Sequence, residues 1–572
     1  MSQPRAAAPA RRDFAIAAAI VALAGLAVLL VDPRGDFPLN DDWAYAFSTR
    51  RFLETGAIER LRWTWAPIVT HVWVGAAASA LAGFSFETLR ATTLVLGAGA
   101  VLAAYGLARG AGLSPERSAL CAAALGVCPV FFNLCFTFMT DVPFAFWTLA
   151  SLAVLARGLR ARGGRAIAAS AAGLALCGAA TALRQPGAAV AIAFAVALVA
   201  TRIRTARQLA GLALGAAGAA LALLVASSLL FGSGDGGGTM LRYLARRVLA
   251  NPNLPYFLAC NGMIALAYTG AFLAPVAPFV APPRGARALA AASVAAGALV
   301  PLALARLSFG APPGVNLVWN AGLGARTLDG LEALPATSAA PWWAAVAIGA
   351  ACGAWTLGAT ALAAVARMRA LRSQPVPWLL LAFPLVYLAP LALRFPFFDR
   401  YLGVAIAPLA IAALGIAGRE RVGPAGRAAT AAALAILAAY SLLGTRDYME
   451  RHRARQVLLD ALAADGVSPR RIDGGFEHAG WHNFDRDDSL FLRNERRWVV
   501  DDEWLVTYAP ARPGHALVRG VEYRRWLPPG RESIQLLVRE PGAREPLAPA
   551  TAGEVGATSA VRGRSPRPSE RR

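Results

Sequence analysis

The stretch FAIAAAIVALAGLAVLLVDPRGDFPLNDDWAYA, residues 14–46, decides the fold of this chain. Its first part, Phe14–Val31, is uncharged and apolar, and at 1.5 Å per residue it is long enough to cross a lipid bilayer. Two adjacent carboxylates, Asp41 and Asp42, follow in the next loop. Because acidic groups are costly to place at a membrane boundary, they usually mark an ion path or a catalytic site.

The composition extends this pattern to the whole chain. Of its 572 residues, 57% are hydrophobic and 16% are charged, whereas soluble proteins carry about 25% charged residues. The six cysteines lie in apolar stretches without metal-ligand spacing, so we expect packing roles and no disulfide framework. Because long apolar runs recur to residue 444, the sequence predicts an all-α polytopic membrane protein.

About thirteen apolar segments are predicted to span the membrane. They lie near residues 14–31, 87–107, 118–136, 143–157, 166–182, 187–201, 209–231, 257–280, 289–307, 341–365, 377–393, 402–417 and 428–444. Residues 67–83 are also apolar, but Pro67, His71 and neighbouring tryptophans interrupt them. We therefore expect a helix at the membrane interface there instead of a span.

The loops between the spans alternate in charge. Arg11 and Arg12 precede the first span, and every second loop after it is short and arginine-rich, from Arg109–Arg117 to Arg419–Arg427. The positive-inside rule places the N-terminus and these loops in the cytoplasm, and the acidic loops and the C-terminus outside. The net charge of +22 therefore reflects the membrane topology. The sequence has no basic patch interleaved with aromatic residues, so nothing in it indicates nucleic-acid binding.

The composition changes after residue 445, where charges become dense. Residues 446–465 predict an amphipathic helix, and short strands are expected near residues 498–500, 504–508, 515–518 and 533–538. The sequence thus predicts a transmembrane domain over residues 1–445, with a first outer loop at 32–66, and a small periplasmic α+β domain over 446–541. The tail, residues 542–572, is expected to be disordered because it is rich in Pro, Ala, Ser and Arg.

The acids of the outer loops admit two interpretations from their chemistry. Adjacent carboxylates before an aromatic residue, as at residues 41–43, can bind a metal or remove a proton from an attacking hydroxyl. Alternatively, the loop is solvated and Asn40 or Asp41 only caps the next helix. Asp141 is likewise either an acid of the site or the N-cap of a helix that starts at Pro143.

Three short motifs, in order along the chain, resemble those of the GT-C membrane glycosyltransferases. The similarity is to family 39, which includes lipid A aminoarabinose transferases and protein O-mannosyltransferases. DDWAYA at residues 41–46 resembles the Asp-Glu-x-x-Tyr-Ala signature of their first outer loop, with Asp42 where the family often has Glu. FMTDVP at 138–143 resembles their Thr-Thr-Asp motif, and FDRYL at 398–402 resembles their Arg-Tyr-Leu element. The resemblance covers roughly residues 10–445.

The resemblance implies a GT-C fold and roles for particular residues. The implied residues are Asp41, Asp42 and Asp141 as catalytic acids, Arg184, Arg394 and Arg400 for donor phosphate, and Tyr45, His71 and Tyr401 for substrate. Asp41 would be the catalytic base or the group that positions the acceptor. Arginine suits phosphate because its planar fork can hold two oxygens. Snorkelling from a helix end is the alternative for Arg184, and a local pair with Asp399 is the alternative for Arg400.

These features predict a bacterial inner-membrane glycosyltransferase. It would move a sugar from a polyprenyl-phosphate donor in the bilayer to a glycan, lipid or protein acceptor on the periplasmic face. The carboxylates could hold a divalent cation, and no other cofactor is indicated; the chain has no Gly-rich phosphate loop. The alternatives are a lipid-linked glycan transporter or flippase, which no inverted repeat supports, and a non-catalytic membrane scaffold.

Overall fold

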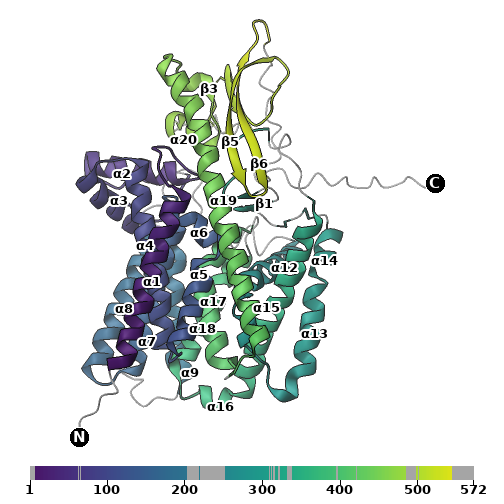
Figure 1. Cartoon of the computed structure of the whole chain (residues 1–572). Coiled ribbons are helices and arrows are strands. Elements are labelled where there is room, and N and C mark those ends of the chain that lie inside the picture. Colours follow the sequence, from purple (N-terminus) through teal and green to yellow (C-terminus); the bar gives the residue numbers. More distant parts are fainter. Residues whose placement is uncertain are drawn as a thin grey trace, which may run out of the picture.

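The computed structural model describes residues 7–201 and 252–543, together with Gly218. Short gaps within these ranges fall at residues 62, 65, 308, 311, 314–315, 320–321, 331–337, 394–396, 420, 485–497 and 500. The described chain is mostly helical, and its long helices lie side by side in one bundle (Figure 1).

In the described part, ten helical segments are long and apolar enough to cross a membrane, so the chain is a multi-pass membrane protein. They are α1 (Ala7–Val31), α4 (Phe86–Gly110), α7 (Asp141–Arg160), α8 (Gly164–Leu183), α12 (Leu254–Leu273), η4 (Arg284–Ala286) with α13 (Arg287–Ala298) and α14 (Val300–Arg306), α15 (Ala340–Ala366), α17 (Pro375–Ala392), η6 (Asp399–Leu402) with α18 (Gly403–Ala417), and α19 (Pro424–Ala464).

Thirteen spans are not all found in the described part of the chain. The span predicted at 118–136 is a bent pair, α5 (Pro115–Gly126) and α6 (Pro129–Cys135), whose axes differ by 68°. The helix breaks there because Pro129 has no N–H group and pushes the preceding residue out of the helical region. Counting that pair gives eleven spans; η1 (Gln185–Ala188) with α9 (Ala189–Ala200) is shorter, and residues 209–231 lie outside the description.

The segment predicted at the membrane interface forms a short helix, α3 (Val69–Ala82), beside α2 (Asp42–Thr55). Both lie at the end of the bundle that carries the C-terminal sheet, which we call the sheet end (Figure 1). Helix α2 starts after Asn40, whose φ of 56° is left-handed, a conformation that asparagine tolerates better than most residues. It stops at Gly56, which has a φ of 71°.

Helix α19 continues beyond its membrane segment without a break, so the boundary predicted at residue 445 falls inside it and the division into domains stays a prediction. Its last turns cover a four-stranded sheet of order β3-β4-β6-β5, in which only β3 and β4 are parallel. The strands are β3 (Ile472–Asp473), β4 (Trp504–Thr507), β5 (His515–Trp526) and β6 (Pro529–Arg539), and α20 (Phe476–Asn483) follows β3. Leu458 and Leu462 of α19 pack against Val506 and Leu536 of the sheet.

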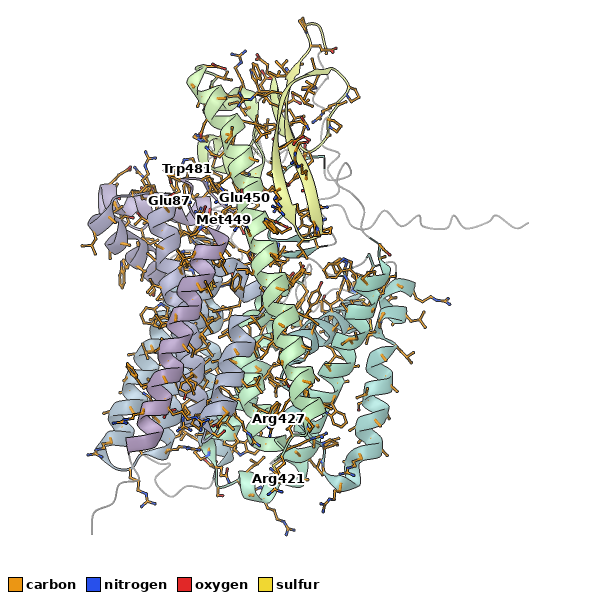
Figure 2. All side chains as sticks on the ribbon, viewed as in Figure 1. Glu87, Arg421, Arg427, Met449, Glu450 and Trp481 are labelled. Carbon is orange, nitrogen blue, oxygen red and sulfur yellow. The ribbon has the colours of Figure 1, made fainter. Side chains whose placement is uncertain are left out.

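The opposite end of the bundle collects arginine-rich loops. Asp13, near the start of α1, pairs with Arg109 at the end of α4, and Arg117 donates a hydrogen bond to the carbonyl of Arg419. These contacts bring the start of α1, the loop after Arg109 and the loop after Arg419 together at one end of the bundle. Figure 2 shows Trp481 of α20 at the other end, so basic loops and sheet lie at opposite ends of the bundle.

Candidate active site

Four charged side chains from distant parts of the sequence meet at the sheet end. Arg184 donates from Nη1 to Oδ1 of Asp141 at 2.5 Å, and Nη1 of Arg400 lies 3.5 Å from Oδ2 of Asp41. Arg400 is also within electrostatic reach of Asp141. We call these four residues the charge cluster. Their side chains are only 9–18% exposed, so their interactions are stronger than they would be in water.

Each member of the charge cluster sits at the end of a helix. Asp41 is the N-cap residue of α2, and Asp141 is the first residue of α7. Carboxylates are stabilised at helix N-termini by the helix dipole. Arg184 follows the last residue of α8, and Arg400 lies in η6, just before α18. The long helices thus hold the cluster from several sides.

Two atoms of the cluster are buried and have no hydrogen-bond partner among the described residues, Oδ2 of Asp141 and Nε of Arg400. Asp41 uses both carboxylate oxygens, since its Oδ1 also accepts a hydrogen bond from the indole of Trp63 at 2.9 Å. A buried polar atom without a partner is costly. The cluster therefore retains hydrogen-bonding capacity for a group that arrives from outside.

A small pocket adjoins the cluster. Its lining residues are Phe131, Leu134, Asp141, Val142, Phe144, Ala145, Tyr387, Arg400, Gly403 and Val404. Asp141 and Arg400 supply the charge, and most of the remaining lining is apolar. The pocket has room for only about one water molecule, so it marks a charged wall beside an apolar one and not a ligand cavity.

Asp42 does not join the charge cluster. It is 1% exposed, its Oδ1 accepts a hydrogen bond from the N–H of Leu39 at 2.6 Å, and its Oδ2 accepts one from the N–H of Phe138 at 3.3 Å. Burial raises the pKa of Asp42 to about 7. Asp42 thus connects the first acidic loop to the loop that leads into Asp141. These contacts suit a residue that positions the site.

His71 and Tyr45 are buried next to the cluster. Nε2 of His71 lies 3.0 Å from the carbonyl oxygen of Phe138, and the two rings stack with centroids 3.9 Å apart. Because burial lowers the pKa of His71 to about 4, its ring is neutral and donates to that carbonyl. Tyr45 meets the edge of His71 at 5.6 Å. The predicted substrate contact His71 thus supports the loop before Asp141.

Of the two remaining predicted residues, Tyr401 lies near the arginines. The ring of Tyr401 is 6.0 Å from the guanidinium carbon of Arg184 and 5.9 Å from that of Arg400. Asp399 does not form a local ion pair with Arg400; it is fully buried and accepts hydrogen bonds from the N–H groups of Leu317 and Val318. Arg394 lies outside the described residues.

Sequence reasoning missed the side chains that hold the first outer loop. Arg90, buried in α4, donates to the carbonyls of Gly35 and Phe37. Glu477 of α20 accepts a hydrogen bond from the N–H of Asn40 at 3.0 Å. An arginine near the start of an apolar span was a usable signal, because such charges usually have a partner or a function. Glu477 carried no comparable signal, since its partner is 437 residues away.

No group of three His, Cys, Asp or Glu side chains in the described part of the chain is placed to hold a metal ion. The divalent cation that the sequence left open would need further ligands from a bound substrate beside Asp41 and Asp141.

No protein-family model and no curated protein matches this sequence. Among solved structures, ArnT from Cupriavidus metallidurans matches in its apo state and bound to undecaprenyl phosphate, each with 16% identity over 70% of this chain and 77% of that one, at TM-scores of 0.31 and 0.32. The Archaeoglobus fulgidus oligosaccharyltransferase in complex with Zn and sulfate matches with 15% identity over 70% of this chain and 53% of its own, at a TM-score of 0.31. At such TM-scores we take no residue role from them.

Proposed function

We propose that this protein is a GT-C membrane glycosyltransferase that transfers a sugar from a polyprenyl-phosphate donor to an acceptor hydroxyl. The observation that carries the proposal is the charge cluster beside an apolar pocket. Two guanidiniums and two carboxylates meet at the sheet end of the bundle, beside apolar side chains such as Val142 and Phe144, and this combination supports a lipid-phosphate donor. A solvated surface network would have neither the burial nor the pocket.

In this proposal, Arg184 and Arg400 bind the phosphate of the sugar donor. Each guanidinium can hold two phosphate oxygens, and both are largely buried, where such charge-assisted hydrogen bonds are strong. Without donor, the two carboxylates balance them. The phosphate of the lipid-linked sugar therefore enters a site whose arginines are already ordered. The Nε–H group of Arg400 can give this phosphate a further hydrogen bond.

The proposed chemistry is a single displacement at the anomeric carbon of the donor sugar. Asp41 takes the proton of the acceptor hydroxyl as its oxygen forms the new bond to that carbon. The bond from the carbon to the phosphate oxygen breaks, and polyprenyl phosphate leaves with the electron pair. Arg184 and Arg400 stabilise the charge on this leaving group. Asp141 orients Arg184 and offers its unpartnered oxygen to the substrates.

The proposed location is the periplasmic side of a bacterial inner membrane. The acidic and arginine-rich loops lie at opposite ends of the bundle, which supports an arginine end in the cytoplasm and a reaction at the sheet end. The acceptor would approach past the chain around Leu317 and Val318, whose N–H groups donate to Asp399.

A donor panel tests the proposal. The purified protein is incubated with several polyprenyl-phosphate monosaccharides and with an envelope extract as acceptor, and free polyprenyl phosphate is measured by mass spectrometry. We expect release from one donor and a matching mass increase in an acceptor. No release from any donor by folded protein would reject the proposal. Movement of the donor across sealed vesicles without a change in acceptor mass would indicate a transporter.

A further inference from the structure

A fully buried ion pair joins the C-terminal region to the first outer loop. Nη1 of Arg455, on α19, lies 2.6 Å from Oε2 of Glu477, on α20, and the two side chains are 1% and 0% exposed. Buried ion pairs are expensive to desolvate, and replacing them by apolar residues is often neutral or stabilising. Stability alone therefore gives little reason for a charged pair at this place.

Both residues of the pair also form hydrogen bonds with other segments of the chain. The other oxygen of Glu477, Oε1, accepts from the N–H of Asn40 at 3.0 Å and from the hydroxyl of Thr327 at 2.8 Å. Nη2 of Arg455 donates to the carbonyl of Pro38 at 3.3 Å. Residues on both sides of Leu39 are thus held from one pair, directly before Asp41.

Helix α20 also packs directly on α2, the helix that Asp41 caps. Trp43 and Phe476 meet edge to face with ring centroids 5.9 Å apart. Gly480 faces the indole so closely that a Cβ atom there would lie 2.4 Å from it. The backbone before Asp41 and the helix after it are therefore both attached to the element that carries Glu477.

We infer that Glu477 is a positioning residue for Asp41: with Arg455 it clamps the Pro38–Asn40 backbone, fixing the direction from which Asp41 meets the acceptor hydroxyl. The inference deepens the proposed function and rests on it for the role of Asp41. The hydroxyl of Thr327 donates to the same carboxylate, so Glu477 also connects the first outer loop to the chain around Thr327. Glu477 itself touches neither substrate nor the reacting atoms.

A paired replacement separates positioning from stability. Glu477→Leu combined with Arg455→Met removes both charges, so no buried charge is left unpaired and the protein should stay folded. The clamp on Asn40 and Pro38 is lost. The control is Glu503→Leu with Arg471→Met, which removes the more exposed pair Arg471–Glu503 of the same region. Glu477→Gln is the conservative variant, because its amide oxygen can still accept from Asn40.

Two readouts decide the inference. Hydrogen exchange of the peptide covering residues 37–46 should become faster in the Glu477–Arg455 double variant and stay unchanged in the control. With the donor found in the panel, kcat should fall about 100-fold, as expected for a displaced catalytic group, while the donor KM stays the same because Arg184 and Arg400 are untouched. Glu477→Gln should recover part of the lost kcat.

Unchanged exchange over residues 37–46 in a folded double variant would overturn the inference, and so would a normal kcat. If the wild-type protein releases no polyprenyl phosphate from any donor, the proposed function fails, and exchange alone then decides whether Glu477 holds the loop. The failure of one claim is thereby distinguishable from the failure of the other.

Discussion

Asp41 and Asp42 are adjacent in the sequence, yet their surroundings give them different tasks. Asp41 faces Arg400 and Trp63 and is 18% exposed, so a substrate can reach it. Asp42 is buried, and its two carboxylate oxygens accept hydrogen bonds from backbone N–H groups of two different loops. Their chemistry alone presents the two acids as equivalent, and only the family resemblance singles out Asp41 as the base. Their different tasks depend on which way each side chain leaves the start of α2, which no residue pattern encodes.

The pKa of Asp42 gives a test of its buried role. Burial places it at about 7, above the value of about 3.9 in an unfolded chain, so the folded state holds the proton between these two values. The contribution of Asp42 to the free energy of unfolding is therefore present below pH ~4 and is lost as the pH rises through ~7. Asp42→Asn, which cannot titrate, should gain in Tm relative to wild type between pH 5 and pH 8. An equal difference in Tm at both values would contradict this assignment.

Arg184 gives a test of donor binding. Arg184→Lys keeps the positive charge but removes the planar fork that can hold two phosphate oxygens. We expect the donor KM to rise about 10-fold or more, since hydrogen bonds to charged groups contribute about 1.5–3 kcal/mol. Arg50→Lys, in an exposed pair with Glu54, is the matched control and should behave as wild type. A lower kcat with an unchanged KM would mean that Arg184 acts only by orienting Asp141.

At the scale of elements, the contact between α2 and α20 carries the connection between the C-terminal region and the site. Trp43 of α2 lies in a cluster of aromatic side chains with Phe476, Phe484 and Trp498. The cluster can form only because Gly480 lets the two helices approach. A small residue at such a crossing is required by packing, since the indole already fills the space.

Gly480→Ala tests this contact. The added methyl would overlap the indole of Trp43, so α20 must shift, at a cost of about 1–3 kcal/mol. We expect a lower Tm together with a lower kcat. The control is Gly178→Ala in α8, where nothing lies within 4 Å of the new Cβ and alanine is the better helix former. Normal activity and a normal Tm in Gly480→Ala would show that α20 does not hold α2.

The elements also show where sequence reasoning reached its limit. Hydropathy identified most of the spans, because each must be apolar over about 20 residues to cross a bilayer. It missed the break before Pro129, which depends on backbone sterics within an apolar run. It also suggested a boundary near residue 445, where charges begin, although α19 continues to Ala464. The composition changes where the chain leaves the membrane, but a helix can continue past that point.

At the scale of the whole molecule, the bundle has two chemically different ends. Figure 2 shows Arg421 at one end and Trp481 at the other. Loop charge was enough to predict that the acids and arginines of the site share an end, because topology alone decides this. It was not enough to predict the Arg184–Asp141 pair or the Glu477–Arg455 pair, because both join residues whose proximity comes from tertiary packing.

Cysteine labelling tests the orientation of these ends. Ala57→Cys lies just after α2 at the sheet end, and Arg421→Cys lies at the other end; both positions are exposed. The native cysteines are buried or half-buried, so their background labelling should be low. A membrane-impermeant maleimide should label Ala57→Cys in intact spheroplasts and Arg421→Cys only after lysis. The reverse pattern would contradict a periplasmic reaction site.

The most direct test of the central claim compares three variants with the donor that the wild type uses. Asp41→Asn and Asp141→Asn each remove one acid of the charge cluster, and Glu54→Gln removes an exposed acid of α2 as the control. Release of polyprenyl phosphate is followed by mass spectrometry over a single turnover. We predict that Asp41→Asn loses at least about 100-fold in rate, as expected when a general base is removed. Asp141→Asn should also be impaired, and the control should match wild type. Transfer at the wild-type rate by folded Asp41→Asn would contradict the account.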